Sequence, residues 1–261
     1  RVTIQGARTG LAGGAVPQGG LVISLTRMTE APELTWSNGR ALLYAQAGVA
    51  LAQIEAEATS CGMFFPPDPT ETSATIGGVY ATAASGLGGL RFGRMSSFVE
   101  ALTWVTPAGE IWSIAKGEYR FGETDCLLPD GRRLDRSLAG MDEGDDLIDF
   151  LSGSEGRLGI AADFRLLALP EYAQRWGIVF FFGDDDAALA FARRLYEWRE
   201  SHAEWLFACE YFNGRALELI ALGGEEGDSR SGLPTFPKAA RAALYVELRG
   251  DASSALEGML E

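Results

Sequence analysis

Residues 5–14 read QGARTGLAGG and open a longer segment, residues 6–20, that holds six glycines and one proline. Short apolar runs at residues 2–5 and 21–25 flank this segment, as is typical of two strands joined by a turn. Glycine has no Cβ atom, so backbone amides here can come close to one another or to a ligand. Because a concave run of amides binds anions, the segment predicts a glycine-lined anion site beside two short strands.

The apolar periodicity that follows predicts hairpins and helices. Apolar runs on both sides of Asn38 and Gly39, which tolerate positive φ, indicate a hairpin over residues 34–47. Apolar residues at spacings of three and four predict an amphipathic helix over residues 49–61, ended by Gly62. We further expect a helix that begins within residues 75–84, a hairpin over 101–114 and a strand over 159–169.

A domain boundary is predicted at Pro170 and Glu171, which divides the chain into residues 1–170 and 171–261. The order of elements beyond it favours an α+β sandwich with helices on one sheet face. The chain begins without Met inside a strand-like run and ends inside an element, so we expect a piece of a longer protein with an incomplete second domain. The expected elements are strands at 176–182, 205–211 and 244–248, and helices at 187–200, at 215–222 and after 248.

Composition narrows the functional class. The 261 residues are 47% hydrophobic with a net charge of −14, and basic and acidic residues balance through residue 99, so the acidic surplus lies beyond it. Such a charge opposes nucleic-acid binding, and no apolar run reaches the roughly 18–20 residues of a membrane span. Cys61, Cys126 and Cys209 are widely spaced and odd in number, which favours reduced thiols in a cytoplasmic protein and no metal site.

Familiar nucleotide and hydrolase motifs are absent. No lysine follows the glycines as a Walker loop requires, and residues 86–91 carry Arg91 where a Rossmann fingerprint needs its third glycine. The single histidine, His202, lies at a charged helix end and is expected to be exposed. It therefore supports neither a Ser-His hydrolase nor a histidine metal site.

Five segments in order resemble the FAD-linked oxidases of the vanillyl alcohol oxidase type. They are residues 6–14, Pro66-Pro67-Asp68-Pro69, Thr75-Ile76-Gly77-Gly78, Arg91-Phe92-Gly93 and Gly153-Ser154-Glu155-Gly156-Arg157-Leu158-Gly159-Ile160. The chain is most similar to the branch with D-lactate dehydrogenase, D-2-hydroxyglutarate dehydrogenase and the flavin subunit of glycolate oxidase. The resemblance is continuous from residue 2 to about 169 and weaker beyond.

The resemblance implies a PCMH-type FAD-binding domain over residues 1–170, with its N-terminal lobe largely missing, and a ferredoxin-like substrate or cap domain over 171–261. Val79 and Ser85 stand where relatives carry Asn and Gly, and Ala83 also replaces an Asn. The motifs hold no histidine for covalent attachment, so the FAD is expected to be noncovalent. Cofactor contacts are implied for Gln5, Gly6, Ala7, Arg8, Thr9, Gly10, Leu11, Pro67, Asp68, Thr75, Gly77, Gly78, Ala81, Ser85, Gly86, Gly156, Gly159 and Ile160.

The implied activity is oxidation of a D-2-hydroxy acid, in which the α-hydrogen leaves as hydride to flavin N5 while a base takes the hydroxyl proton. The family's catalytic base, its histidine cluster and any metal would lie outside this chain, so the catalytic residues stay unassigned. The electron acceptor is also unassigned, and a homodimer or a subunit of a complex would fit. Two alternatives are an electron-relay subunit that binds flavin without its own substrate, and a flavin-free structural remnant.

Overall fold

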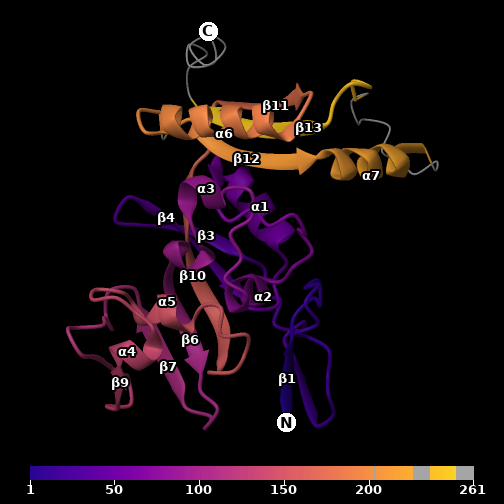
Figure 1. Cartoon of the computed structure of the whole chain (residues 1–261). Helices are drawn as coiled ribbons and strands as arrows, with labels where there is room; N and C mark the ends of the chain where they lie inside the picture. Colours follow the sequence, from indigo (N-terminus) through magenta and orange to yellow (C-terminus); the bar gives the residue numbers. More distant parts are fainter. Residues whose placement is uncertain (203, 226–235, 251–261) are drawn as a thin grey trace. The chain divides into compact units, whose positions relative to one another are not determined.

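The chain is described from a computed structural model, which covers residues 1–202, 204–225 and 236–250 (Figure 1). It divides into two compact units. The first unit comprises residues 1–86 and 92–171, and the second comprises residues 87–91 and 172–261. The short segment 87–91 therefore belongs to the second unit although it is embedded in the sequence of the first.

The first unit is built on an antiparallel sheet in which strand β10 (Ile160–Pro170) is central. The strand order is β3 (Glu33–Ser37), β4 (Arg40–Gln46), β10, β6 (Val99–Val105) and β7 (Ile111–Ala115), and the short β5 (Met63–Phe64) pairs with the end of β10. Both expected hairpins, β3–β4 and β6–β7, are present. A separate parallel pair, β1 (Val2–Gln5) and β2 (Leu21–Ser24), flanks the glycine-rich segment.

The first hairpin forms because of its two turn residues. Asn38 and Gly39 have φ of 50° and 76°, and Ser37 pairs with Arg40 across the turn. Two consecutive positive φ values give the tight turn whose twist matches that of the strands. The alternation in β4 then buries Leu43 and Ala45.

Helix α1 (Leu51–Ser60) confirms the predicted amphipathic helix. Leu51, Ile54 and Ala58 are buried in the core of the first unit, and Gly62 follows the helix at φ 70°. A left-handed residue just past a helix suits glycine because it lacks a Cβ atom. Burial of a side chain such as Ile54 stabilises the fold by roughly 1.5–3 kcal/mol.

Helix α2 (Ile76–Ala81) begins at the position expected for it and has Ile76, Val79 and Tyr80 buried. The helix is only six residues long. Its hydrophobic side chains join the core that β4, β6 and β10 form. The remaining short helical segments are α3 (Gly89–Phe92), η1 (Met95–Phe98), α4 (Arg136–Ala139) and α5 (Leu147–Leu151).

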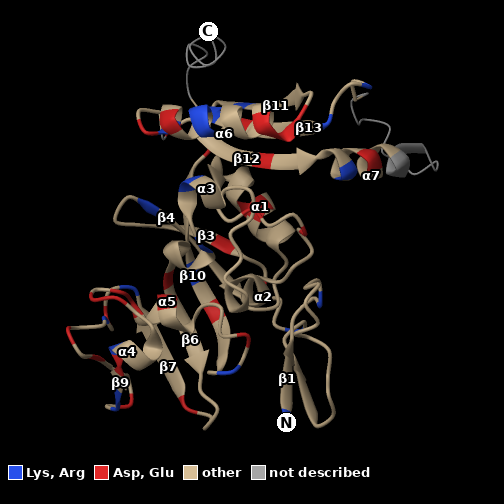
Figure 2. Ribbon diagram, in the orientation of Figure 1, with Lys and Arg blue, Asp and Glu red and all other residues tan. Residues whose placement is uncertain are grey.

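The weakly patterned residues 117–146 form a two-stranded sheet of β8 (Asp125–Leu127) and β9 (Arg133–Asp135), followed by α4. Arginine and acidic residues gather there (Figure 2). The segment is fixed at its end by Asp146, whose side chain accepts from the amides of Gly117 at 2.5 Å and Ile148 at 2.9 Å. The second bond caps α5.

The second unit has the order β11 (Gln174–Phe182), α6 (Asp185–Arg199), β12 (Leu206–Asn213), α7 (Gly214–Glu225) and β13 (Ala242–Gly250). Strand β13 lies between β11 and β12 and is antiparallel to both. Strands β11 and β12 are thus parallel with a strand between them, which is the split βαβ arrangement of ferredoxin-like folds. The α+β class is confirmed.

A hydrophobic core joins α6 to one face of this sheet. It contains Leu195 of the helix and Leu244, Val246 and Leu248 of the central strand. The helix predicted after residue 248 lies outside the described residues.

His202 corrects one expectation, because it is half-buried rather than exposed. Its ring stacks on Trp198 with centroids 4.4 Å apart, and Nδ1 lies 3.0 Å from the Trp198 carbonyl oxygen. Stacking on the preceding helical turn covers one face of the imidazole, which the sequence pattern did not indicate. Among the described residues, no helix combines the length and apolar character that crossing a bilayer requires.

Candidate cofactor site

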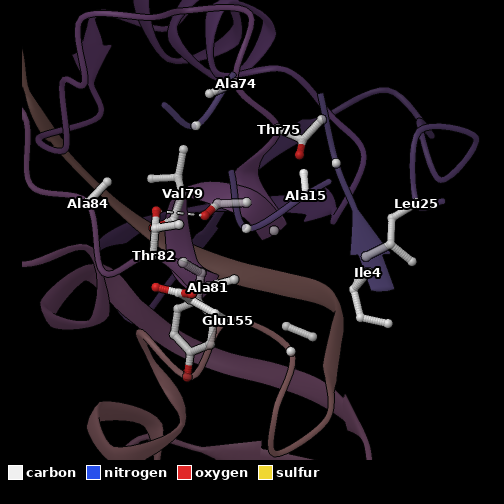
Figure 3. Close-up of a pocket in the computed structure, with 18 of the residues that line it drawn as sticks. Ile4, Ala15, Leu25, Ala74, Thr75, Val79, Ala81, Thr82, Ala84 and Glu155 are labelled. Atoms are coloured by element: carbon white, nitrogen blue, oxygen red, sulfur yellow. Dashed lines mark hydrogen bonds between the residues drawn. The ribbon is translucent and has the colours of Figure 1, made fainter. Parts of the chain in front are cut away.

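A cavity of about 270 Å³ lies within the first unit (Figure 3). Three walls enclose it: β1 with the glycine-rich segment, the first turns of α2, and the loop that leads into β10. Ile4, Leu25 and Trp104 supply apolar surface. Its charged lining residues are Arg8, Glu71 and Glu155, so side chains alone do not make it cationic.

Most residues predicted to contact the cofactor line this cavity. Those in the lining are Gly6, Ala7, Arg8, Thr9, Gly10, Thr75, Gly77, Gly78, Ala81, Gly156, Gly159 and Ile160. Those outside it are Gln5, Leu11, Pro67, Asp68, Ser85 and Gly86. The structure therefore brings together segments that are up to about 150 residues apart in sequence.

Thr75 directly precedes α2 and lies where the glycine-rich segment meets this helix. Its side chain is 5% exposed, and among the described residues its Oγ1 atom has no hydrogen-bond partner. A Cβ atom at Gly6 would lie 2.2 Å from this oxygen, and one at Gly78 would lie 3.3 Å from it. The glycines thus allow two backbones to close around the hydroxyl. A buried hydroxyl without a partner costs about 1–3 kcal/mol, which a bound polar ligand would recover.

The backbone amides of Gly77 and Gly78 in α2 are not equivalent. Gly77 donates to the Ala47 carbonyl oxygen at 2.9 Å, and Ile76 donates to Val49 at 2.8 Å. A Cβ atom at Gly77 would lie 2.8 Å from that of Ala47, so this glycine is needed for packing within the protein. Within the described part of the chain, the Gly78 amide has no acceptor, so it is available to a ligand.

The loop of residues 153–160 is held on α2 by backbone hydrogen bonds. Gly153 donates to Tyr80 at 3.1 Å and Glu155 donates to Ala81 at 3.0 Å. A Cβ atom at Gly156 would lie 2.9 Å from Ile4, and a Cβ atom at Gly159 would lie 2.5 Å from Trp104 Nε1. The glycines of this motif therefore let the loop pack tightly between β1 and β6.

Tyr80 also lines the cavity, but it does not act as a base. Burial, with the charges of Asp149 and Asp146, raises its pKa well above the usual value. Its hydroxyl donates to the Ile148 carbonyl oxygen at 2.6 Å. Tyr80 is thus a neutral lining residue whose hydrogen bond connects α2 to α5.

Two of the residues outside the cavity, Gly86 and Gln5, have local structural roles. Gly86 bridges Asp68, and a Cβ atom there would lie 1.9 Å from the Asp68 carbonyl oxygen. Gln5 donates through Nε2 to Ala15 at 2.7 Å and so braces the two ends of the glycine segment. Leu11 is fully exposed.

Sequence reasoning missed most of the apolar wall. Val79 and Ala84 line the cavity, and Val79 stands where relatives carry an amide side chain. The apolar–polar alternation of β1, which puts Val2 and Ile4 on one face of the strand, could have indicated Ile4. The further lining residues outside the predicted motif segments include Ala15, Leu25, Glu71, Ala74, Thr82, Trp104, Leu151 and Ala161, and those inside the segments but not predicted as individual contacts are Ala12, Gly14, Pro69, Ser154 and Glu155.

Comparison with known proteins places this geometry in a family. Residues 1–115 match the family described as the FAD binding domain. The chain is 30% identical to a D-lactate dehydrogenase of Archaeoglobus fulgidus over 95% of its own length and 52% of the relative. It is 35% identical to a D-lactate dehydrogenase of Anaerostipes hadrus over 65% of its length and 31% of the relative. A glycolate oxidase subunit of Bacillus subtilis is 28% identical over 94% of the chain and 46% of the relative.

The solved structure of an alkyldihydroxyacetonephosphate synthase has the same fold, with a TM-score of 0.70 at 16% identity over 99% of this chain and 44% of the other. The fold and cavity thus define an FAD-binding domain of the PCMH type. The chain thus carries an FAD-binding domain like that of FAD-linked oxidoreductases, and its cofactor is FAD. It spans between about a third and a half of the length of the curated relatives named above.

Proposed function

We propose that the whole protein oxidises a small D-2-hydroxy acid, of the lactate, glycolate or 2-hydroxyglutarate kind, with noncovalent FAD in the cavity of the first unit. The observation that carries the cofactor part is the Thr75 hydroxyl, buried without a partner between Gly6 and Gly78. The substrate class is supported by the names of the relatives, two D-lactate dehydrogenases and a glycolate oxidase subunit among them.

The residues of the cavity suit a dianionic pyrophosphate that side chains cannot neutralise. Arg8 supplies one positive charge, while Glu71 and Glu155 oppose it. Backbone amides of the glycine-rich segment and of Gly78 would supply the remaining donors. The Thr75 hydroxyl would donate to an oxygen of the cofactor. The lining holds neither His nor Cys, which supports noncovalent binding.

Bound FAD supplies the two-electron acceptor that takes the α-hydrogen of the acid. The chain's own contribution is to fix the cofactor and to keep water from it with Ile4, Val79 and Trp104. We assign no catalytic base within the described residues, and the electron acceptor is left open. A cytoplasmic location is part of the proposal, supported by three cysteines that form no disulfide in the structure. Either a homodimer or a complex with an electron-accepting partner is compatible with it.

The test is anaerobic reduction of the full-length, FAD-loaded protein. D-lactate, D-2-hydroxyglutarate or glycolate should bleach the oxidised flavin spectrum in a single turnover, because hydride transfer needs no external acceptor. L-lactate is the matched control and should leave the spectrum unchanged. A protein that is inert to all D-acids yet takes electrons from a redox partner would contradict the proposal and favour an electron-relay subunit.

A further inference from the structure

One of the five motif segments, Arg91-Phe92-Gly93, contributes no residue to the lining of the cofactor cavity, whereas each of the other four does. The segment lies where the chain passes from one unit to the other. Residues 87–91 belong to the second unit, and Phe92 belongs to the first. This position favours a role in joining the units rather than in contacting the cofactor.

The chain passes between the units at three peptide bonds, which follow residues 86, 91 and 171. We call the bond between Arg91 and Phe92 the motif crossing, and the bond between Glu171 and Tyr172 the linker crossing. The two crossings are about 80 residues apart in sequence. Contacts within each unit show whether they are also joined in the fold.

On the side of the second unit, Arg91 and Tyr172 lie against each other. The guanidinium carbon of Arg91 is 4.9 Å from the centroid of the Tyr172 ring, which is a cation–π distance. Arg91 is half-buried and also donates through Nη1 to the Glu204 carbonyl oxygen. The residues next to the two crossings are therefore held together within this unit.

Leu90 anchors the motif crossing in the second unit. Its side chain packs against the hydrophobic core that contains Leu195 of α6. Its carbonyl oxygen accepts a hydrogen bond from Nη2 of Arg199, the last residue of α6, at 2.9 Å. Both the core and the end of the helix thus hold the chain just before the crossing.

On the side of the first unit, β5 joins the same two crossings. The rings of Phe92 and Phe64 have centroids 5.8 Å apart. Phe64 pairs with Leu169 at the end of β10, and the Glu171 amide donates to the Gly62 carbonyl oxygen at 3.1 Å. Phe92 and Glu171 are therefore attached to the same short stretch of chain.

This arrangement limits how the units can move. A unit joined by one chain crossing can turn about many backbone bonds, because each residue has two soft dihedral angles. Two crossings that are held together on both sides must bend together, which leaves fewer directions of movement. Domain hinges are built from a few such residues in loops or at the ends of elements.

We propose that the motif crossing and the linker crossing form one hinge between the units, and that Arg91 and Phe92 are its positioning residues. Arg91 holds the two crossings together in the second unit, and Phe92 does so in the first. The hinge restricts the second unit to a narrow range of positions. This role is independent of the substrate and of the electron acceptor.

Pulsed electron paramagnetic resonance of the full-length, FAD-loaded protein measures this restriction. Spin labels at Ser113→Cys on β7 and Arg193→Cys on α6, both exposed positions, report the distance between the units. The accessible native cysteines, Cys61 and Cys209 among them, are replaced by serine, and the buried Cys126 stays unlabelled. This labelled protein should give one narrow distance distribution.

Arg91→Ala should widen the distribution at least about twofold, because the two crossings then move separately and domain motion is no longer restrained. Arg91→Lys should restore part of the narrow distribution, since it keeps a cation over the Tyr172 ring. The matched control is Arg94→Ala, which removes an exposed arginine of the first unit three residues further along and should leave the width unchanged.

Phe92→Leu tests the other side of the hinge, because it removes the ring contact with Phe64 but keeps an apolar side chain. It should also widen the distribution, and it decides the question if Arg91→Ala does not fold. Distributions as narrow in the folded variants as in the labelled protein would overturn the proposal. Equal widening by Arg94→Ala would do the same.

Cofactor affinity separates the hinge from a role in binding FAD. The Kd for FAD should be the same in Arg91→Ala and the unaltered protein, because Arg91 does not line the cavity. A raised Kd for FAD together with an unchanged distance distribution would assign the motif to the cofactor and contradict the hinge.

Discussion

The two units differ in whether a buried side-chain oxygen has hydrogen-bond partners. In the first unit, the Thr75 hydroxyl is buried in the cavity wall and has no partner among the described residues. In the second unit, the buried Glu247 carboxylate accepts hydrogen bonds from the side chains of Arg175, Tyr245 and Arg249. An unsatisfied buried group costs free energy in the absence of a ligand, whereas a saturated one fixes its neighbours. The first arrangement indicates a site for a ligand's own polar atoms, and the second indicates a rigid support.

Loss of the Glu247 carboxylate should have the largest effect on stability. Glu247→Ala would remove the carboxylate that pairs with the buried Arg249 and leave a cavity beside it. Removing one partner of a buried pair costs about 3–5 kcal/mol. Denaturant unfolding of the second unit, followed by the fluorescence of Trp176 and Trp205, would measure this. Glu218→Ala breaks an exposed pair instead and should change stability by about 0–1 kcal/mol. Equal effects of the two changes would contradict the assigned role of Glu247.

Gly77→Ala should have the next largest effect on stability, a loss of about 1–3 kcal/mol, because the added Cβ atom would lie 2.8 Å from the Cβ atom of Ala47. The loss should appear in flavin-free protein, since the crowded neighbour belongs to the chain itself. Thermal unfolding without FAD is the measurement. Gly10→Ala is the control, because nothing lies within 4 Å of a Cβ atom there. Destabilisation seen only with FAD present would show that the space beside Gly77 belongs to the cofactor.

Thr75→Val should affect stability and cofactor binding in opposite directions. Removing an unpaired buried hydroxyl should leave flavin-free protein as stable or more stable by up to about 1 kcal/mol. The Kd for FAD, measured by quenching of flavin fluorescence, should rise about fivefold to tenfold because one donor is lost. Thr35→Val on β3, outside the cavity, should change neither quantity. An unaltered Kd for FAD in Thr75→Val would remove the main support for the cofactor position.

Acidification should weaken the second unit through Glu247, and this effect is the smallest. The folded-state pKa of Glu247 is below its ordinary value of 4.5, so its stabilising contribution is fully present above about pH 4.5 and is lost as the pH falls through the folded pKa. Unfolding free energies measured across this range should fall less steeply for Glu247→Gln than for the unaltered protein. Parallel pH profiles would mean that Glu247 gains no protonation-linked stability from Arg175 and Arg249.

Much of the fold could be predicted from local chemistry. Asn38-Gly39 specifies a hairpin turn and Gly62 ends a helix because both depend on φ values that few residues adopt. The site was harder to predict, because the sequence shows where a glycine stands but not which residue it contacts in the fold. Gly77, Gly86 and Gly159 resemble ligand contacts in a motif, yet Ala47, Asp68 and Trp104 are what a Cβ atom would meet.

The charged cluster of the second unit was beyond the sequence pattern for a related reason. Arg175 and Glu247 are about 70 residues apart and meet only because β11 and β13 pair with Gly177 opposite Glu247. A single acidic residue in an apolar strand reads as an exposed position by alternation. Its burial depends on the registers of both neighbouring strands, which no short motif encodes.

Hydrogen–deuterium exchange of the full-length protein, with and without FAD, tests most directly whether the cavity of the first unit holds the cofactor. Added FAD should protect the amides of residues 6–14 and of Gly78, for which no backbone acceptor is found among the described residues. The Gly77 amide, already bonded to Ala47, and the amides of β13 should exchange equally in both states. Unchanged exchange across residues 6–14 and at Gly78, in protein that binds FAD, would contradict the account.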